Sequence, residues 1–155
     1  DAVKNKMKYI ISTIGKIRNN EEDFITRKYL KRIRNIELKQ YEVKIKNREK
    51  RIEEEADKLI NSTPKDGKLI LLDEEGVNIS SSDLAKLILN WNNNNITSVN
   101  FAIGGAFGNG IKIKRTADKI IALGRLTWPH QMVKMMISEQ IYRIETIIHG
   151  HPYHK

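Results

Sequence analysis

The sequence predicts a single α/β domain with a mostly parallel sheet and helices on both of its faces. Short β-rich runs alternate along the chain with longer stretches of helical periodicity, as in layered α/β proteins. Two of these runs, 69–72 and 99–103, are almost wholly apolar, which is typical of central parallel strands buried on both faces. The 155 residues, 39% of them hydrophobic, are enough for one sizeable core but hardly for two.

Five strands and five helices are expected in alternation. The β-rich runs predict strands at 8–13, 40–45, 68–72, 98–103 and 119–123. Helical periodicity predicts helices at 22–33, 48–61, 82–91, 111–117 and 131–148. Ser82 and Asp83 are expected to cap the third helix, because their side-chain oxygens can accept hydrogen bonds from unpaired backbone amides, and the fifth helix follows Pro129. The asparagine run 92–95 is expected to form a polar turn.

The net charge of +9 favours a polyanionic partner, nucleic acid above all, because lysines and arginines that neutralise phosphates release condensed counterions. The charge is unevenly placed. Residues 1–68 hold 19 Lys or Arg against 12 Asp or Glu, residues 69–110 hold 1 against 4, and residues 111–155 hold 8 against 3. Alternatively, a biased genome explains the abundant Lys, Asn and Ile, and many of the lysines only solvate the surface.

Composition excludes several classes of protein. The chain has no cysteine, which excludes disulfides and thiolate-bound metals. Its apolar runs are far shorter than the roughly 20 residues of a membrane helix, and no signal-peptide pattern opens it, so a cytoplasmic protein without a membrane partner is expected. Residues 1–6 precede Met7 without periodicity and are expected to be a non-native or disordered extension.

The segment 103–110 follows a predicted strand, precedes a predicted helix and is rich in glycine. Its backbone amides can approach a ligand without hindrance from a Cβ atom, so it is a candidate binding loop. The order Gly105-x-x-Gly108-x-Gly110 reverses the dinucleotide-binding pattern, and Ile111 stands where a phosphate-binding loop needs lysine. The ligand is therefore open on these grounds, and a purely structural glycine turn is the alternative.

Histidines gather near the end of the chain. His130, at the head of the last predicted helix, is placed to face a site, although an ordinary helix-terminal histidine fits equally well. His149, His151 and His154 could in principle bind zinc. Pro152 interrupts any helix that would align them, and no acidic or thiolate partner is close in sequence, so no metal is expected. No nucleophile elbow supports hydrolase chemistry.

Two aromatic residues are candidates for stacking on unpaired RNA bases, Trp128 and Tyr153, although either could equally pack within the fold. Trp91 and Phe107 are expected to lie in the core.

The last predicted helix carries more apolar residues than one narrow stripe. They are Met132, Val133, Met135, Met136, Ile137, Ile141, Tyr142, Ile144, Ile147 and Ile148. One face can meet the sheet, and the remainder would be exposed unless another molecule covers it, so a homodimer is expected. The alternative is a helix buried on both sides within one chain.

Several blocks of the sequence are similar to one known family. They are Met7-Lys8 through Ile14-Gly15-Lys16, Leu71-Leu72-Asp73, Ile103-Gly104-Gly105, Leu126-Thr127-Trp128-Pro129-His130-Gln131-Met132, Glu139-Gln140-Ile141-Tyr142-Arg143 and Pro152-Tyr153-His154-Lys155. With them the chain resembles, over nearly its whole length from Met7, the ribosomal RNA large subunit methyltransferase H family. These are SPOUT-class enzymes that methylate N3 of a pseudouridine in 23S rRNA. One departure is Ala106-Phe107, which replaces a Pro-Glu or Ser-Asn pair and leaves the geometry of this loop open.

The resemblance implies one SPOUT domain at 7–155 with a C-terminal trefoil knot, which general folding rules would discount. It implies S-adenosylmethionine as the cofactor, held by Leu72, Gly104, Leu123, Gly124, Arg125, Leu126, Thr127 and Trp128. The RNA-facing residues that it implies are His130, Arg143, Tyr153, His154 and Lys155. The tail is then expected to reach a site built across a homodimer, with 23S rRNA of the ribosome as the partner.

The chemistry that the resemblance implies is an in-line displacement of a methyl group from a sulfonium. Such a reaction needs alignment and a deprotonated nitrogen more than a covalent nucleophile. His130, or a water beside it, could assist deprotonation of N3, and the general base is left open. A small enzyme without an added RNA-binding domain is expected to recognise the assembled ribosome by shape and phosphate contacts. The alternatives are a non-catalytic rRNA-binding protein and, disfavoured by the glycine order, a nucleotide-binding oxidoreductase.

Overall fold

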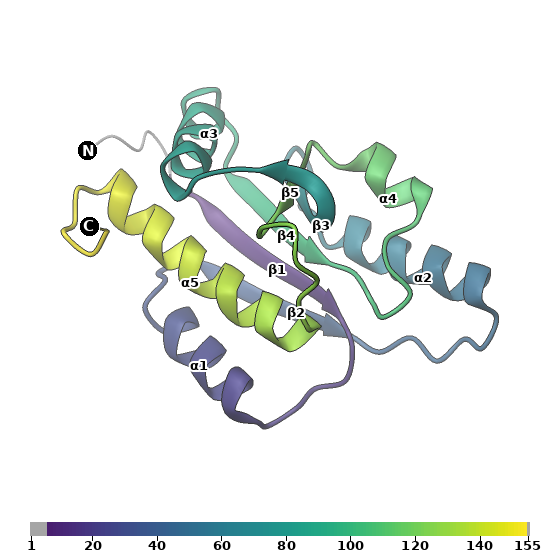
Figure 1. Ribbon diagram of the computed structural model, residues 1–155. Coiled ribbons are helices and arrows are strands. Elements are labelled where there is room, and N and C mark those ends of the chain that lie inside the picture. Colours follow the sequence, from purple (N-terminus) through teal and green to yellow (C-terminus); the bar gives the residue numbers. More distant parts are fainter. Residues whose placement is uncertain (1–5, 155) are drawn as a thin grey trace.

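The computed structural model describes residues 6–154 and has one parallel sheet between two layers of helices (Figure 1). The strands are β1 (Lys8–Ile14), β2 (Ile36–Tyr41), β3 (Lys68–Asn78), β4 (Ser98–Ile103) and β5 (Lys119–Ala122). The helices are α1 (Glu21–Leu30), α2 (Arg48–Asn61), α3 (Ser81–Asn93), α4 (Ile111–Thr116) and α5 (His130–Ile148). The expected single α/β domain is confirmed. Residues 1–5, within the expected N-terminal extension, and Lys155 lie outside the described part of the chain.

The five strands stand in the order β2-β1-β4-β3-β5, and every neighbouring pair is parallel. The two apolar runs therefore occupy central positions, as predicted. Asn100 interrupts the run in β4 and is fully buried. Its side chain accepts a hydrogen bond from the Ser12 hydroxyl at 2.8 Å and donates to the Leu59 carbonyl at 3.0 Å and the Thr63 hydroxyl at 3.1 Å. The polar group is satisfied, and it fixes α2 against the sheet.

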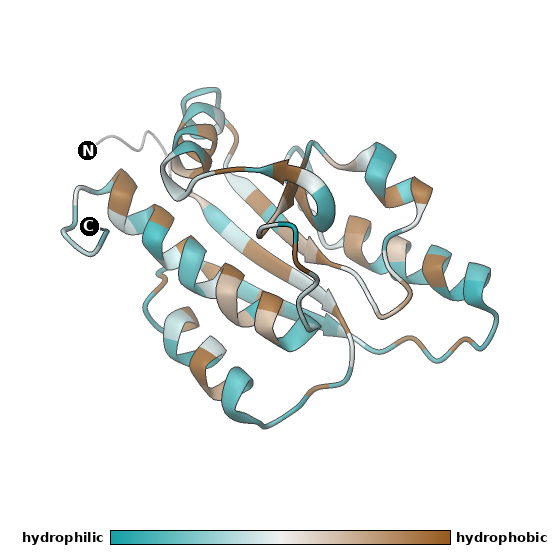
Figure 2. Cartoon of the chain, viewed as in Figure 1, coloured by the Kyte–Doolittle hydropathy of each residue, from teal (hydrophilic) through white to brown (hydrophobic). Residues whose placement is uncertain are grey.

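Each face of the sheet has its own apolar core. Helices α1, α3 and α5 cover one face, where Ile88, Phe101 and Ile141 belong to the larger cluster. Helices α2 and α4 cover the other face, where Leu59 and Ile113 belong to the smaller cluster. Polar and apolar bands alternate along the helices (Figure 2), as expected when one face packs on a sheet. Within residues 6–154, no helix has both the length and the apolar character needed to cross a membrane.

The predicted position of the second strand, 40–45, is wrong: the strand lies four residues earlier, at Ile36–Tyr41. Strand β2 pairs with β1 from Tyr9 opposite Ile36 to Ile14 opposite Tyr41. Residues 42–45 continue the alternation of β2 but find no partner, because β1 ends at Ile14. The end of β2 is therefore decided by the length of β1, and the residues of β2 themselves carry no information about that length.

The other boundaries differ by smaller amounts, for local reasons. Helix α1 ends at Leu30 rather than at 33, and β3 extends to Asn78. The predicted caps of α3, Ser82 and Asp83, are wrong: Ser80 caps this helix, and its hydroxyl accepts a hydrogen bond from the Asp83 amide at 3.0 Å. Three consecutive serines precede Asp83, and the first of them is the cap. The expected polar turn lies at the end of α3, which stops at Asn93.

Helix α5 lies between α1 and α3 on the sheet (Figure 1). Ile137, Ile141 and Ile144 are fully buried, and the seven other apolar residues named above are partly buried. Helices α1 and α3 cover much of its flanks, so the apolar residues outside the sheet-facing stripe are only partly exposed within one chain. A homodimer needs support from other observations.

A buried ion pair joins α5 to α1. The Lys134 side chain is 1% exposed, and its Nζ lies 3.6 Å from Oδ1 of Asp23, which is itself 9% exposed. Arg27 contacts the other oxygen of Asp23 at 3.2 Å. Burial lowers the pKa of Lys134, and the charge of Asp23 opposes this shift. The pair holds the two helices in one orientation, at the cost of removing both charges from water.

Replacing Asp23 with alanine should lower the free energy of unfolding by about 3 kcal/mol, because it leaves the Lys134 ammonium buried without an opposite charge. The double variant Asp23→Ala, Lys134→Met should recover most of this loss, since no buried charge is then left in the interface and the remaining cation, Arg27, is half-exposed. Urea unfolding of the two variants and the wild type measures both differences. Equal destabilisation of the single and double variants would show that the ion pair does not govern this contact.

Candidate functional site

A cavity of about 380 Å³ lies at the carboxyl edge of the sheet, where β4 and β5 end and β3 has an irregularity between Leu72 and Val77. Its walls include seven of the eight residues predicted to hold a cofactor: Leu72, Gly104, Leu123, Gly124, Leu126, Thr127 and Trp128. His130 lines it as well, from the first turn of α5. These residues come from β3 and from the segments after β4 and β5, which are far apart in the sequence and which the parallel topology brings to one edge. Their proposed contacts with a cofactor stay a prediction.

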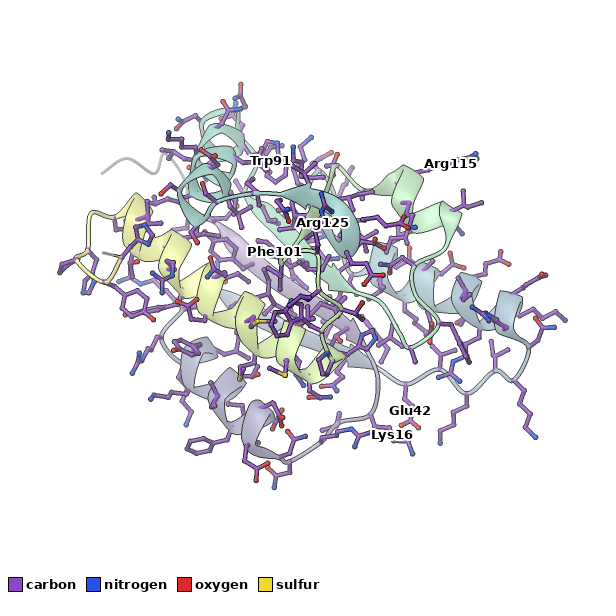
Figure 3. All side chains as sticks on the ribbon, in the orientation of Figure 1. Lys16, Glu42, Trp91, Phe101, Arg115 and Arg125 are labelled. Carbon is purple, nitrogen blue, oxygen red and sulfur yellow. The ribbon has the colours of Figure 1, made fainter. Side chains whose placement is uncertain are left out.

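Arg125, the eighth predicted residue, has another role in the fold. Its Nη1 donates hydrogen bonds to the carbonyls of Glu74 and Gly76, each at 2.9 Å, and Figure 3 shows it beside the curved part of β3. Thr127 adds a hydrogen bond from its hydroxyl to the Glu74 carboxylate. The loop after β5 is thus fixed to β3 by contacts within the chain. The knot expected in this region stays a prediction.

Asn109 is a residue of this cavity that sequence analysis missed. Its Nδ2 donates to the Leu72 carbonyl at 3.2 Å and to Oδ2 of Asp73 at 2.9 Å, so it ties the glycine loop to the end of β3. Its Oδ1 is buried and has no hydrogen-bond partner among the residues described. A Cβ atom at Gly104 would collide with this side chain. The only signal in the sequence was the place of Asn109 between Gly108 and Gly110.

The cavity has an acidic wall. Asp73, Glu74 and Glu75 line it or its rim, against the cations Lys114 and, when protonated, His130. Lys114 is shared between two of the carboxylates, with its Nζ 3.9 Å from Asp73 and 3.5 Å from Glu75. A cleft lined by one sign of charge concentrates ligands of the other sign. The cavity therefore favours a cationic or zwitterionic ligand over a polyphosphate.

The two aromatic residues expected in the core differ in position. Trp91 packs against the larger core cluster, whereas Phe107 is 40% exposed, so the expectation for Phe107 is wrong. Trp128, a candidate for stacking, is partly buried, and its indole Nε1 donates to the Leu123 carbonyl at 2.9 Å. This bond fixes the ring in the wall of the cavity.

The predicted RNA-facing residues form two separate groups within one chain. His130 lines the cavity, whereas Arg143, Tyr153 and His154 meet at the other half of α5. Arg143 follows His130 by 13 residues in α5, and a rise of about 1.5 Å per residue places them roughly 20 Å apart. Lys155 lies outside the described residues.

The tail folds back onto α5 through a network centred on Glu139. Arg143 donates to Oε1 of Glu139 from Nε at 2.9 Å, with Nη2 at 2.6 Å from the same atom, and its Nη1 lies 3.0 Å from His154 Nδ1. The Tyr153 hydroxyl donates to Glu139 at 3.2 Å, and its ring packs edge-on against Tyr142. Burial, a hydrogen bond with Tyr29 and the negative charge of Glu139 raise the pKa of Tyr153 to about 12, so the phenol stays protonated at neutral pH. Glu139 was quoted only as part of a motif, and its positioning role came from the structure.

Other features at the C-terminal end belong to the opposite edge of the sheet. A cavity of about 690 Å³ there is lined by Tyr9, Arg32, His149 and His151 among others, and by none of the residues predicted to contact the cofactor. The histidines have different partners: His149 contacts Glu145 at 2.9 Å, and His151 accepts from the Tyr153 amide at 3.2 Å. No group of three potential metal ligands occurs among residues 6–154.

Comparison with known proteins identifies the family. A family model described as "Predicted SPOUT methyltransferase" matches residues 7–154. The ribosomal RNA large subunit methyltransferase H of Nitrobacter hamburgensis is 35% identical over 159 residues, covering 96% of this chain and 99% of the relative. The protein of the same name from Paramagnetospirillum magneticum is 34% identical with the same coverage, and that from Geotalea uraniireducens is 46% identical over 66% of this chain. The chain therefore belongs to the SPOUT methyltransferases, and among them to the ribosomal RNA large subunit methyltransferase H family.

Proposed function

We propose that the protein transfers a methyl group from S-adenosylmethionine to N3 of a pseudouridine in 23S rRNA, on assembled ribosomes in the cytoplasm. The observation that carries this proposal is the acidic cavity at the carboxyl edge of the sheet, where seven of the eight expected cofactor residues meet. The names of full-length relatives, which specify large-subunit ribosomal RNA, support the class of substrate.

The cavity fits this cofactor in size, charge and hydrogen bonding. Its volume of about 380 Å³ lies within the usual range of small-molecule sites, about 300–1,000 Å³. Asp73, Glu74 and Glu75 complement the positive charges of the ligand, and the buried Oδ1 of Asn109 can accept a hydrogen bond from one of its amino groups. Phosphate-bearing ligands such as ATP and NAD are disfavoured by the same carboxylates.

Bound S-adenosylmethionine supplies a methyl group on a positively charged sulfur, which an attacking nitrogen displaces in line. The irregular middle of β3 and the loops after β4 and β5 hold the donor in one orientation, and their fixed hydrogen bonds limit its movement. His130 is exposed and stands at the cavity, where it can orient the base or take the N3 proton.

A homodimer would bring the two groups of RNA-facing residues together. Within one chain Arg143 lies roughly 20 Å from His130 along α5, and Glu139, which holds Tyr153 of the tail, lies roughly 13 Å from it, too far for the tail and His130 to hold the same base. A groove of about 610 Å³ runs beside α5, lined by Met135, Met136 and Ile25, and Phe24 of α1 is 65% exposed. We infer that a second copy covers this apolar strip and places its own tail beside the cavity.

The variant Met136→Glu should shift the protein from dimer to monomer and lower methyl transfer with it, because a charge then lies in the proposed contact. Met136 is only partly buried within the chain, so the fold should tolerate this change, whereas Ile141 is fully buried and unsuitable. Analytical ultracentrifugation measures the oligomeric state, and Asn90→Glu, at an exposed position of helix α3, is the charge-matched control. A Met136→Glu protein that is monomeric but fully active would contradict a site shared between two subunits.

Calorimetric titration with S-adenosylmethionine, ATP and NAD tests the proposed cofactor. We expect binding of S-adenosylmethionine or its demethylated product and none of the two nucleotides, since neither phosphate-binding motif is complete. Ribosome binding without any response to S-adenosylmethionine would instead favour the non-catalytic rRNA-binding alternative. Tight binding of NAD alone would contradict both.

A further inference from the structure

Phe107 is an exposed aromatic residue at the tip of the glycine loop. Its neighbours Ala106 and Gly108 line the cavity, whereas its own ring packs against the start of α2 and is 40% exposed. Exposure of a large aromatic ring on a short loop beside a cofactor cavity has no role in the packing of the core. The ring is available for contact with a ligand that approaches the cavity from outside.

Two arginines hold this ring. The Cζ atoms of Arg48 and Arg51 lie 5.3 Å and 5.1 Å from its centroid, within the range of cation–π contacts. Arg51 is fixed in turn by Glu55, whose buried carboxylate lies 3.3 Å from its Nε. A Cβ atom at Gly105 would come within 2.8 Å of the same carboxylate, so loop and helix are in close contact. Phe107 is thus part of a fixed stack that ends in the exposed side chain of Arg48.

The surroundings of this stack are basic, in contrast to the cavity. Residues 44–51 hold five cations against one carboxylate, and Lys44, Lys46, Arg48 and Lys50 are exposed. The loop after β1 adds Lys16 and Arg18, and it adjoins the end of β2 through the bond from the Gly15 amide to the Tyr41 carbonyl at 2.8 Å. Glu42, labelled with Lys16 in Figure 3, lies 4.0 Å from Lys44 and offsets one of these positive charges. A phosphate backbone would be attracted to this strip and repelled by the acidic cavity.

We propose that Phe107 and Arg48 form a stacking site for an unpaired RNA base beside the nucleotide to be methylated. Unpaired bases stack on aromatic rings and on guanidinium planes, and phosphates pair with arginine and lysine. The base would pack on the exposed part of the Phe107 and Arg48 stack, and its phosphate would contact Arg48 and the strip at 44–50. The location next to the target nucleotide rests on the proposed function, whereas the stacking itself does not.

Binding of a single-stranded oligouridine of twelve nucleotides, followed by fluorescence anisotropy, tests the site. Phe107→Ala should weaken this binding on the order of 10-fold and leave binding of an abasic strand of equal length unchanged. Phe107→Trp should restore it, because the larger ring still stacks. Arg48→Ala should weaken binding of both strands and flatten the log-log salt slope by about 0.7, the value for one phosphate contact.

Two control variants remove the same kinds of side chain, one apolar and one cationic, from helix α4 instead of from the proposed stacking site. Ile111→Ala removes an apolar side chain that is 68% exposed on α4, and Arg115→Ala removes an exposed cation of the same helix, labelled in Figure 3. Both should behave as the wild type. Unchanged oligouridine binding by Phe107→Ala, equal loss on the abasic strand, or no binding by the wild type at low salt would overturn the proposal.

Methyl transfer to ribosomes separates this proposal from the proposed function. Phe107→Ala should raise the KM for ribosomes about 10-fold with kcat and the affinity for S-adenosylmethionine unchanged. A wild-type protein that neither binds S-adenosylmethionine nor methylates ribosomes would refute the proposed function, while the oligouridine experiment would still decide whether Phe107 binds RNA. An unchanged KM in an active enzyme would overturn the placement beside the target.

Discussion

Removal of residues 151–155 should reduce methyl transfer to ribosomes about 100-fold or more and leave the affinity for S-adenosylmethionine nearly unchanged. The tail touches the second half of α5, through Arg143, Glu139 and Tyr142, and none of its described residues, 151–154, lines the cavity. Small misplacements of reactants are costly when alignment supplies most of the rate. Tritiated methyl incorporation into ribosomes measures the transfer rate of the wild type and the truncated protein, and calorimetry measures their affinity for S-adenosylmethionine.

Truncation after Gly150 should not unfold α5, because the bonds that end this helix remain. The His149 amide donates to the Glu145 carbonyl at 3.0 Å, and the Gly150 amide to the Ile147 carbonyl at 3.2 Å. Tyr153→Phe is a milder companion, since it removes the hydroxyl bond to Glu139 and keeps the ring packed on Tyr142. A truncated enzyme that methylates at the wild-type rate would show that the tail is a passive terminus.

Replacing Gly104 with alanine should weaken binding of S-adenosylmethionine on the order of 100-fold, equal to about 2.7 kcal/mol. A Cβ atom there collides with the Asn109 side chain, which must then leave its bonds to Leu72 and Asp73. The glycine loop would move away from β3, and the buried Oδ1 of Asn109 would no longer face the ligand. The protein should still fold, since the collision is confined to one loop.

The background of Asn109→Ala separates this mechanism from direct contact between Gly104 and the ligand. Asn109→Ala alone should weaken binding, because the loop loses both bonds to β3. In that background the further loss caused by Gly104→Ala should be small, since the colliding side chain is absent. Equal losses in both backgrounds, measured by calorimetry as a double-mutant cycle, would mean that the Cβ atom meets the ligand itself.

The sequence predicted those elements whose signal is local. Central strands were recognisable from their apolar composition, and α2, with its long periodic pattern, was placed at its observed bounds. Strand β2 was misplaced because its alternation runs on to Ile45, and only the length of β1 decides where pairing stops. The exposure of α5 could not be judged from the sequence, because it depends on α1 and α3, which pack against its flanks only in the tertiary structure.

The candidate site followed the same division. The glycine loop and the block around Thr127 could be found from motifs, whereas Asn109 and Glu139 act through partners far along the chain or in a folded tail. Arg125 shares its motif with cavity residues, yet its bonds to Glu74 and Gly76 turn it toward β3. Phe107 was expected in the core on grounds of polarity alone, and its contacts with Arg48 and Arg51 became visible only in three dimensions.

Methylation of ribosomes that lack the modification tests the central claim most directly. Purified protein is incubated with these ribosomes and tritiated S-adenosylmethionine, the rRNAs are separated, and the labelled nucleoside is identified by mass spectrometry. We predict label in the large-subunit rRNA as N3-methylpseudouridine, none in the small-subunit rRNA, and loss of the signal in the protein truncated after Gly150. Absence of label from the large-subunit rRNA, with a folded protein and intact ribosomes, would contradict the account.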